Sequence, residues 1–113
     1  MTRASKPKPL LRLSEREVVA QCIGVLRTQG YTCIRLNSGL LQTPDGRRIR
    51  IGDTGMPDWI VLRGSEYCLL EIKATGKSLT AEQTAWHADA KRKSLRVAWT
   101  NELEGLRHKV EGA

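Results

Sequence analysis

Apolar residues near the start of the chain recur at the spacing of an α-helix. The stripe follows Ser14, ends before Gly30 and consists of Val18, Val19, Cys22, Ile23 and Leu26. Ser14 with Glu17 three residues later is a capping-box pattern, and a glycine commonly follows the end of a helix. The pattern therefore predicts a helix between Ser14 and Gly30. On a helical wheel, Glu15 lies near the middle of the stripe, whereas Arg16 and Glu17 point away from it.

The apolar spacing changes to that of β-strands after this helix. Alternating or β-branched runs predict strands at residues 31–37, 40–43, 47–51, 58–62 and 67–73. Residues 44–46 (Pro-Asp-Gly) and 64–65 (Gly-Ser) have turn composition, so each is expected to close a hairpin. The second hairpin would pair the strands at 58–62 and 67–73 in an antiparallel manner.

Helix and strand alternate in the last third of the chain. Thr80 is expected to cap a helix over residues 81–94, and a strand follows at 95–101. The inner face of that helix would hold Gln83, Trp86, Ala90 and either His87 or Lys93. Asn101 is expected to cap a last helix with apolar positions at Leu103, Leu106 and Val110. This order of elements predicts an α/β fold with a central mixed β-sheet flanked by helices.

The composition adds a basic character to this single domain. The chain has 113 residues and a net charge of +7. This length accommodates one hydrophobic core, so residues 10–113 are expected to form one domain. Residues 1–9 are basic and contain Pro7 and Pro9, which predicts a flexible arm. The excess of positive charge favours a polyanionic partner, and nucleic acid is the leading class.

Other classes are disfavoured by what the sequence lacks. No apolar run approaches the roughly 18 residues of a membrane span, so no membrane partner is expected. The first residues lack the apolar segment of a secretory signal. Cys22, Cys33 and Cys68 lie in apolar stretches without metal-type spacing and are interpreted as buried thiols. These features together predict a reducing, cytoplasmic location.

Two opposite charges lie near the end of the strand predicted at 67–73. Glu71 and Lys73 are two residues apart and therefore share one face of that strand. Because buried charges are costly unless paired or bound to a metal, a structural Glu71–Lys73 ion pair is the simplest interpretation. A second interpretation arises because Asp58 begins the neighbouring strand and would reach the same end of the hairpin. Asp58, Glu71 and the backbone carbonyl of Ile72 would then offer oxygen ligands suited to Mg²⁺ or Mn²⁺.

Such an arrangement suits the hydrolysis of a phosphodiester. A bound divalent cation lowers the pKa of its water and neutralises charge that builds on a phosphate. Lys73 would stabilise the attacking hydroxide and the transition state beside it. This chemistry agrees with the polyanionic partner that the net charge predicts.

The motif Pro57-Asp58, Glu71-Ile72-Lys73 and then Gln83 in the next helix resembles the PD-(D/E)xK nuclease superfamily. Within it the chain is most similar to the VRR-NUC branch, the virus-type replication and repair nucleases, including small stand-alone forms. The likeness spans residues 14–100 and is carried by SE at 14–15, RLNSG at 35–39, GMPDWIVL at 55–62, CLLEIKATGKSLTAEQTAWHADA at 68–90 and RVAWT at 96–100. It implies a restriction-endonuclease-like fold.

Carried onto this sequence, the resemblance implies a Mg²⁺- or Mn²⁺-dependent endonuclease. Asp58, Glu71 and the carbonyl of Ile72 become metal ligands. Lys73 becomes the catalytic lysine. Gln83 becomes the glutamine that lies near this lysine and the scissile phosphate.

Further expectations come from the same resemblance. Glu15 matches the acidic residue of the first helix, which takes part in catalysis by holding the metal directly or through water. The implied substrate is branched or otherwise structured DNA, such as Holliday junctions or flaps, in replication, recombination or repair. A homodimer and a bacterial or phage origin are implied as well.

Basic residues outside the motif are candidates for phosphate contacts. They are Arg35, Arg47, Arg48 and Arg50 along strand and hairpin, and Lys77 in the loop after the motif. A solvated charged face is the alternative. Trp59, Trp86 and Trp99 are expected to fill the core because the chain has no Phe. His87 and His108 are expected at surface or lightly packed positions rather than as ligands.

Two other function classes stay open on the sequence. One is a non-catalytic nucleic-acid-binding module with the same fold and basic surface. The other is a small basic RNA-associated or structural protein in which Glu71 and Lys73 form only an ion pair. Replacing Glu71 separates this last class from a metal site, because a lost ion-pair partner destabilises the fold whereas removal of a crowded carboxylate relieves repulsion.

Overall fold

Helices and strands alternate along the chain in the order that the apolar pattern predicts. The computed structural model describes residues 12–36 and 39–113, with the backbone alone at 39–41 and 49–51. The elements are α1 (Glu15–Thr28), β1 (Thr32–Arg35), β2 (Gly39–Gln42), β3 (Arg48–Ile51), β4 (Trp59–Arg63), β5 (Glu66–Ile72), α2 (Ala81–Arg92), β6 (Val97–Thr100) and α3 (Leu106–Glu111). The predicted amino-terminal arm lies outside the described residues.

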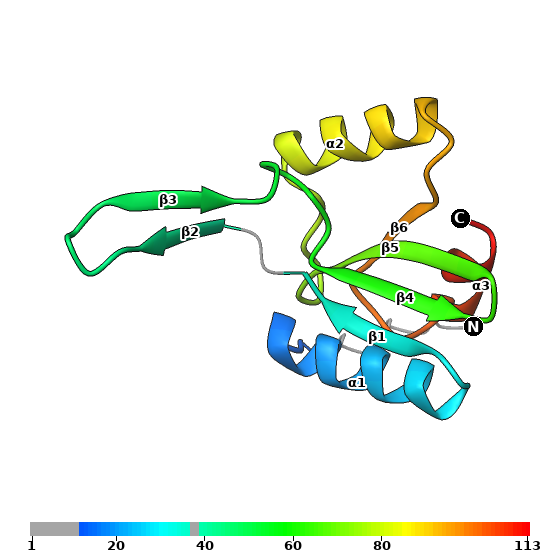
Figure 1. The fold of residues 1–113 in the computed structure, drawn as a ribbon. Helices are drawn as coiled ribbons and strands as arrows, with labels where there is room; N and C mark the ends of the chain where they lie inside the picture. Colours follow the sequence, from blue (N-terminus) through cyan, green and yellow to red (C-terminus); the bar gives the residue numbers. More distant parts are fainter. Residues whose placement is uncertain (1–11, 37–38) are drawn as a thin grey trace, which may run out of the picture.

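Four of the strands form one mixed sheet in the order β1-β4-β5-β6. β4 is antiparallel to both β1 and β5, whereas β5 and β6 are parallel. The prediction of an α/β fold with a central mixed sheet is therefore confirmed. β2 and β3 form a separate antiparallel hairpin that projects away from this sheet (Figure 1). The first turns of α1 and α2 lie at the same end of the molecule as this hairpin (Figure 1).

A tight turn fixes the register between β4 and β5. Gly64 has a φ of +61°, which glycine adopts without steric cost, and Arg63 pairs directly with Glu66 across the turn. The same register pairs Trp59 with Leu70. Because a slip of one residue would turn every side chain to the other face, this turn decides where the charged end of β5 points.

The hydrophobic core lies between one face of the sheet and the helices α1 and α3. It contains the α1 residues of the predicted stripe except Val19, which is half-buried, together with Leu106 and Val110 of α3. All three cysteines are buried and free, as predicted. Trp59 belongs to this core, but Trp86 and Trp99 are only half-buried, so the prediction that all three fill it is wrong. α2 lies on the opposite side of the sheet from α1 (Figure 1).

Both long helices begin at the N-cap that the sequence predicts, and each has a capping box, which was predicted for α1 alone. Ser14 and Glu17 form it at α1, and Thr80 and Gln83 form it at α2. Two predictions about α2 are resolved by burial. His87 is the inward residue rather than Lys93, and at 5% exposure it lies deeper than the lightly packed position predicted for it.

The last helix starts later than predicted. Its N-cap is Gly105, which adopts a φ of +73°, because residues 101–105 form bends and turns instead of helix. Asn101 does not cap it, since its Nδ2 donates to the carbonyl of Lys77 at 2.8 Å. Leu103 is correspondingly exposed. The prediction of an Asn101-capped helix is therefore wrong, although Leu106 and Val110 are buried as expected.

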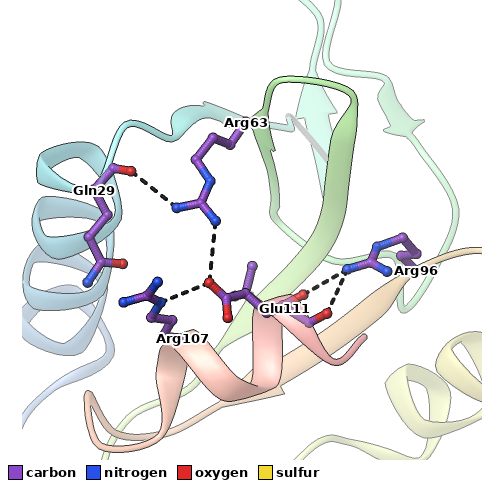
Figure 2. Close-up of polar contacts among 6 residues, drawn as sticks. Gln29, Arg63, Arg96, Arg107 and Glu111 are labelled. Atoms are coloured by element: carbon purple, nitrogen blue, oxygen red, sulfur yellow. Dashed lines mark hydrogen bonds and ion pairs between the residues drawn. The ribbon is translucent and has the colours of Figure 1, made fainter.

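Arginine side chains fasten α3 to the rest of the domain (Figure 2). The Glu111 carboxylate accepts from Arg107 Nε at 2.8 Å and from Arg63 Nη2 at 3.3 Å. Arg63 also donates to the carbonyl of Gln29 and lies over the ring of Tyr31. These contacts tie the end of α3 to β4 and to the end of α1.

No helix in the described part of the chain is both long enough and apolar enough to cross a membrane.

Candidate functional site

The register of the central hairpin brings Asp58 and Glu71 side by side. β4 pairs with β5 so that Trp59 lies opposite Leu70, and one further step places Asp58 opposite Glu71. Residues directly opposite in antiparallel strands have side chains close enough to interact. A hydrogen bond from the Asp58 backbone to the Glu71 carboxylate supports this proximity. The two acids that the sequence predicts as partners are therefore neighbours.

Glu71 is a buried carboxylate in an unfavourable environment. Its exposed fraction is 1%, and its Oε1 atom makes no hydrogen bond within the described residues. The pKa of Glu71 is raised to about 7, mainly by burial and next by the charge of Asp58, against a smaller lowering by Lys73. A buried acceptor without a donor is costly, and so is a second carboxylate beside it. The site therefore favours an added positive charge at the Glu71 oxygens.

Lys73 is held by Gln83 rather than by Glu71. Lys73 Nζ donates to Gln83 Oε1 at 3.1 Å, and the same oxygen accepts from the backbone N–H of Thr80 at 2.9 Å. The ion pairs within 4.0 Å among the described residues do not include Glu71 with Lys73. The capping box of α2 thus positions the glutamine, and the glutamine positions the lysine. This geometry opposes the simple ion-pair interpretation of the two charges.

A close backbone contact brings the loop before Asp58 against the first turn of α2. Gly55 has a φ of +86°, and a Cβ at this position would lie 2.5 Å from the carbonyl oxygen of Glu82. Only glycine fits such an approach without a shift of the backbone. The contact joins the loop that carries Asp58 to the helix that carries Gln83. Sequence reasoning assigned Gly55 to a loop but missed this role.

The carbonyl of Ile72 lies beside a residue that cannot donate to it. The backbone N–H of Leu36 donates to the carbonyl of Asp58 at 2.6 Å, so the backbone groups of the preceding residue, Pro57, face β5. The ladder ends at Trp59 and Leu70, and its register continued by two residues would place Pro57 opposite Ile72. Proline has no N–H, so the ladder hydrogen bond expected at this position cannot form from residue 57. This geometry is compatible with the predicted use of the Ile72 carbonyl as a ligand.

Glu15 lies at the open rim of the site and not in the core. It is the first residue of α1 and its side chain is exposed, so it is solvated although it lies on the same side of the helix as Val19, with which it lines a cavity. This cavity of about 290 Å³ is also lined by Asp58, and the charge of Glu15 contributes to the raised pKa of Glu71. Arg16 lines the same cavity although the wheel predicted that it points away. The first turn of α1 reaches the carboxylates because it lies at the end of the sheet.

The predicted phosphate contacts divide between this cavity and the projecting hairpin. Arg35 lines the cavity, and Arg48 is exposed on β3. Arg47 is exposed too, but its Nε lies 3.1 Å from Asp45 Oδ2 in the hairpin turn. The side chain of Arg50 lies outside the described residues. Lys77 is exposed in the loop between β5 and α2.

The donor set fits Mg²⁺ or Mn²⁺ better than a metal that needs an all-protein cage. Within residues 12–36 and 39–113, no group of three His, Cys, Asp or Glu side chains is arranged to hold a metal ion. Two carboxylates and a carbonyl suit a magnesium ion, which retains several of its waters. The unsatisfied oxygen of Glu71 beside Asp58 supports this fit. Direct ligation by Glu15 stays a prediction.

Comparisons with protein families, curated proteins and solved structures gave no match to this chain. The likeness to VRR-NUC nucleases therefore stays a prediction from the sequence motif.

Proposed function

We propose that the protein is a Mg²⁺- or Mn²⁺-dependent endonuclease that hydrolyses phosphodiester bonds in DNA, on a restriction-endonuclease-like fold. The observation that carries the proposal is the buried Glu71 carboxylate, which lies beside Asp58 and whose Oε1 makes no hydrogen bond to any residue that the structure describes. A structural carboxylate in this position would have a cationic partner within the chain. The surroundings of Glu71 instead suit a carboxylate that binds a metal cation.

Each residue of the site has a distinct task in this proposal. Asp58, Glu71 and the Ile72 carbonyl hold the cation, which supplies an acidic water and neutralises charge on the phosphate. Lys73 stabilises negative charge near the scissile phosphate, and Gln83 keeps its ammonium oriented through the 3.1 Å hydrogen bond. Glu15, at the rim, orients a water or the cation.

The substrate preference is proposed from charge and from the family resemblance. The net charge of +7 favours DNA, and Arg35, Arg48 and Lys77 supply exposed cations near the site end of the molecule. Branched or structured DNA is the proposed target, with a homodimer that presents two sites to one junction. The small size of the domain supports a dimer, because one copy has little surface with which to hold a branched duplex.

A cleavage panel tests the activity directly. Labelled flap, fork, Holliday junction and plain duplex substrates are incubated with the full chain and Mg²⁺ or Mn²⁺. Cleavage of a branched substrate by the parent, and its loss in Asp58→Asn, is the expected result. Glu66→Gln is the matched control, since Glu66 is an exposed acid on β5 beyond the tight turn. A parent protein that leaves every substrate intact contradicts the proposal.

A non-catalytic nucleic-acid-binding module is the second candidate, and the basic surface supports it equally well. Calorimetric titration with Mn²⁺ separates the two candidates. The endonuclease predicts binding that is lost in Glu71→Ala and that tightens as pH rises through about 7, because the metal must displace the proton of Glu71. Binding of DNA without any Mn²⁺ binding at Glu71 would favour the module.

A further inference from the structure

We propose that the open edge of β6 binds an extended acidic segment of a partner protein as an additional strand. This surface is separate from the candidate nuclease site, because none of the residues assigned to that site lines it. The proposal stands on three features of the described residues: an unpaired strand edge, a groove along it, and lysines without acidic partners.

The outer edge of β6 offers backbone hydrogen-bonding groups. β6 is the last strand of the four-stranded sheet. The N–H groups of Leu69 and Lys73 donate to the carbonyls of Arg96 and Thr100, so alternate residues of β6 face β5. Val97 and Trp99 therefore direct their N–H and C=O groups outward. Such an edge is a template for an added strand.

A groove of about 670 Å³ runs along this edge. Its walls come from the end of α2, the strand itself and the end of α3, and include Lys91, Leu95, Arg96, Val97, Trp99 and Lys109. Arg96 forms part of the wall because its Nη2 donates to the carbonyls of Val110 and Glu111 (Figure 2). The groove thus combines apolar side chains with a basic rim and follows the direction of the strand.

The lysines of the groove lack carboxylate partners. In the part of the chain that the structure describes, neither Lys91 nor Lys109 lies within 4.0 Å of a carboxylate. The two nearest acids in sequence are already engaged, Asp89 with Arg92 and Lys93, and Glu111 with two arginines. The groove therefore favours an occupant with negative charge.

An acidic peptide fits these features better than two other occupants. A second copy paired through β6 would bring like charges together, because Lys91 and Lys109 of both copies would line the same interface. A DNA backbone offers acceptors but no donors, so it would leave the outward carbonyls of Val97 and Trp99 unsatisfied. An extended peptide supplies both donors and acceptors, and its acidic side chains complement the lysines.

Fluorescence anisotropy and hydrogen exchange test this inference with the full chain. The probe is a labelled peptide of alternating glutamate and valine, and the control peptide has lysine in place of glutamate. We expect the acidic peptide alone to bind, with affinity reduced about fivefold by Lys91→Glu and again by Lys109→Glu. Lys93→Glu, on the same helix end but outside the groove, is the matched control and should change the affinity less.

Amide exchange distinguishes strand addition from a loose charge contact. With the acidic peptide bound, the N–H groups of Val97 and Trp99 should gain protection, while that of Ala98, which already faces β5, should not. Equal binding of both peptides, or binding without new protection, overturns the proposal. Protection of the same amides by a single-stranded DNA oligonucleotide, or by self-association in sedimentation without peptide, overturns it in favour of DNA or a second copy.

Discussion

Two glutamates at opposite ends of the domain have opposite surroundings. Glu111, at the end of α3, is exposed and accepts from Arg107 and Arg63 (Figure 2). These hydrogen bonds hold the pKa of Glu111 below its ordinary value. Glu71, at the end of β5, is buried and has its pKa raised to about 7, and its Oε1 has no hydrogen-bond partner in the described part of the chain. One carboxylate is satisfied by the fold and the other is not.

This contrast separates a structural polar network from a candidate reactive one. At α3, Glu111 pairs with Arg63 and Arg107, so these solvent-accessible charges fasten a short helix at little desolvation cost. At the site end, Glu71 lies beside Asp58, its Oε1 makes no hydrogen bond within the described residues, and the nearby Lys73 is held by Gln83. Groups whose pKa is shifted by burial and by a like charge concentrate at functional sites.

The largest expected effect is on cleavage. Lys73→Ala should reduce the cleavage rate about 10²–10³-fold, because the transition state loses a positioned positive charge. Arg107→Ala, which removes a cation from the α3 network, should leave the rate within a few-fold of the parent. Single-turnover rates with Mg²⁺ and circular dichroism of both variants provide the measurement. Equal losses of cleavage rate in Lys73→Ala and Arg107→Ala would contradict a specific role of Lys73 in cleavage.

The second effect is on stability without metal. Glu71→Gln should stabilise the chain above pH 7 by roughly 3 kcal/mol, since deprotonation of the buried group no longer opposes folding. The raised pKa means that the native state binds the extra proton between pH 4.5 and about 7. The free-energy cost of burying the charged Glu71 carboxylate is therefore absent below pH 4.5 and complete above pH 7. Urea unfolding of the parent and of Glu71→Gln across this pH range, with a chelator present, measures the difference in free energy of unfolding.

Glu111→Gln is the matched variant and should change the free energy of unfolding in the opposite direction. Its lowered pKa means that the stabilising contribution is present at neutral pH and is lost as pH falls below the ordinary value of 4.5. The substitution should therefore destabilise the chain at neutral pH and have no effect in acid. Destabilisation by Glu71→Gln at neutral pH would instead support the ion-pair interpretation of Glu71 and Lys73.

The third effect concerns the contact between the loop and α2. Gly55→Ala should destabilise the chain by about 2 kcal/mol, because a left-handed φ is unfavourable for alanine and the Cβ would meet Glu82. Gly55→Ala should also slow cleavage, because the backbone shift that relieves the contact with Glu82 would move Asp58 away from Gln83. Gly24→Ala in α1 meets no atom within 4 Å and should stabilise by about 0.5–1 kcal/mol. Thermal unfolding and cleavage rates distinguish the two variants.

The smallest effect is on binding to DNA. Arg48→Ala should lower the slope of log affinity against log salt by about 1, as expected for a lost phosphate contact. Arg47→Ala should lower it less, because Arg47 is already paired with Asp45. Anisotropy titrations at several salt concentrations provide both slopes. A larger loss for Arg47 would contradict the assignment of the hairpin charges.

Much of the candidate site follows from local sequence. Ser14 and Thr80 begin their helices as predicted, because a capping box needs only residues three apart. The turn at Gly64 and the alternation of β5 together predict that Asp58 and Glu71 meet. Helical spacing, by contrast, did not predict that Glu15 and Arg16 would line one cavity with Asp58, since a wheel does not show where a helix extends past the sheet. Asn101 does not cap α3, because its side-chain amide donates to the carbonyl of Lys77 in a distant loop.

The order of residues along the chain is enough to predict the apolar stripes, the tight turns and the acids at strand ends, because these depend on sequence neighbours. Three features are set by packing instead: Lys73 is held by Gln83, Gly55 touches α2, and Glu71 Oε1 has no hydrogen-bond partner among the described residues. The first two contacts join segments that are distant in sequence. The third depends on burial, which is set by every element that packs around β5.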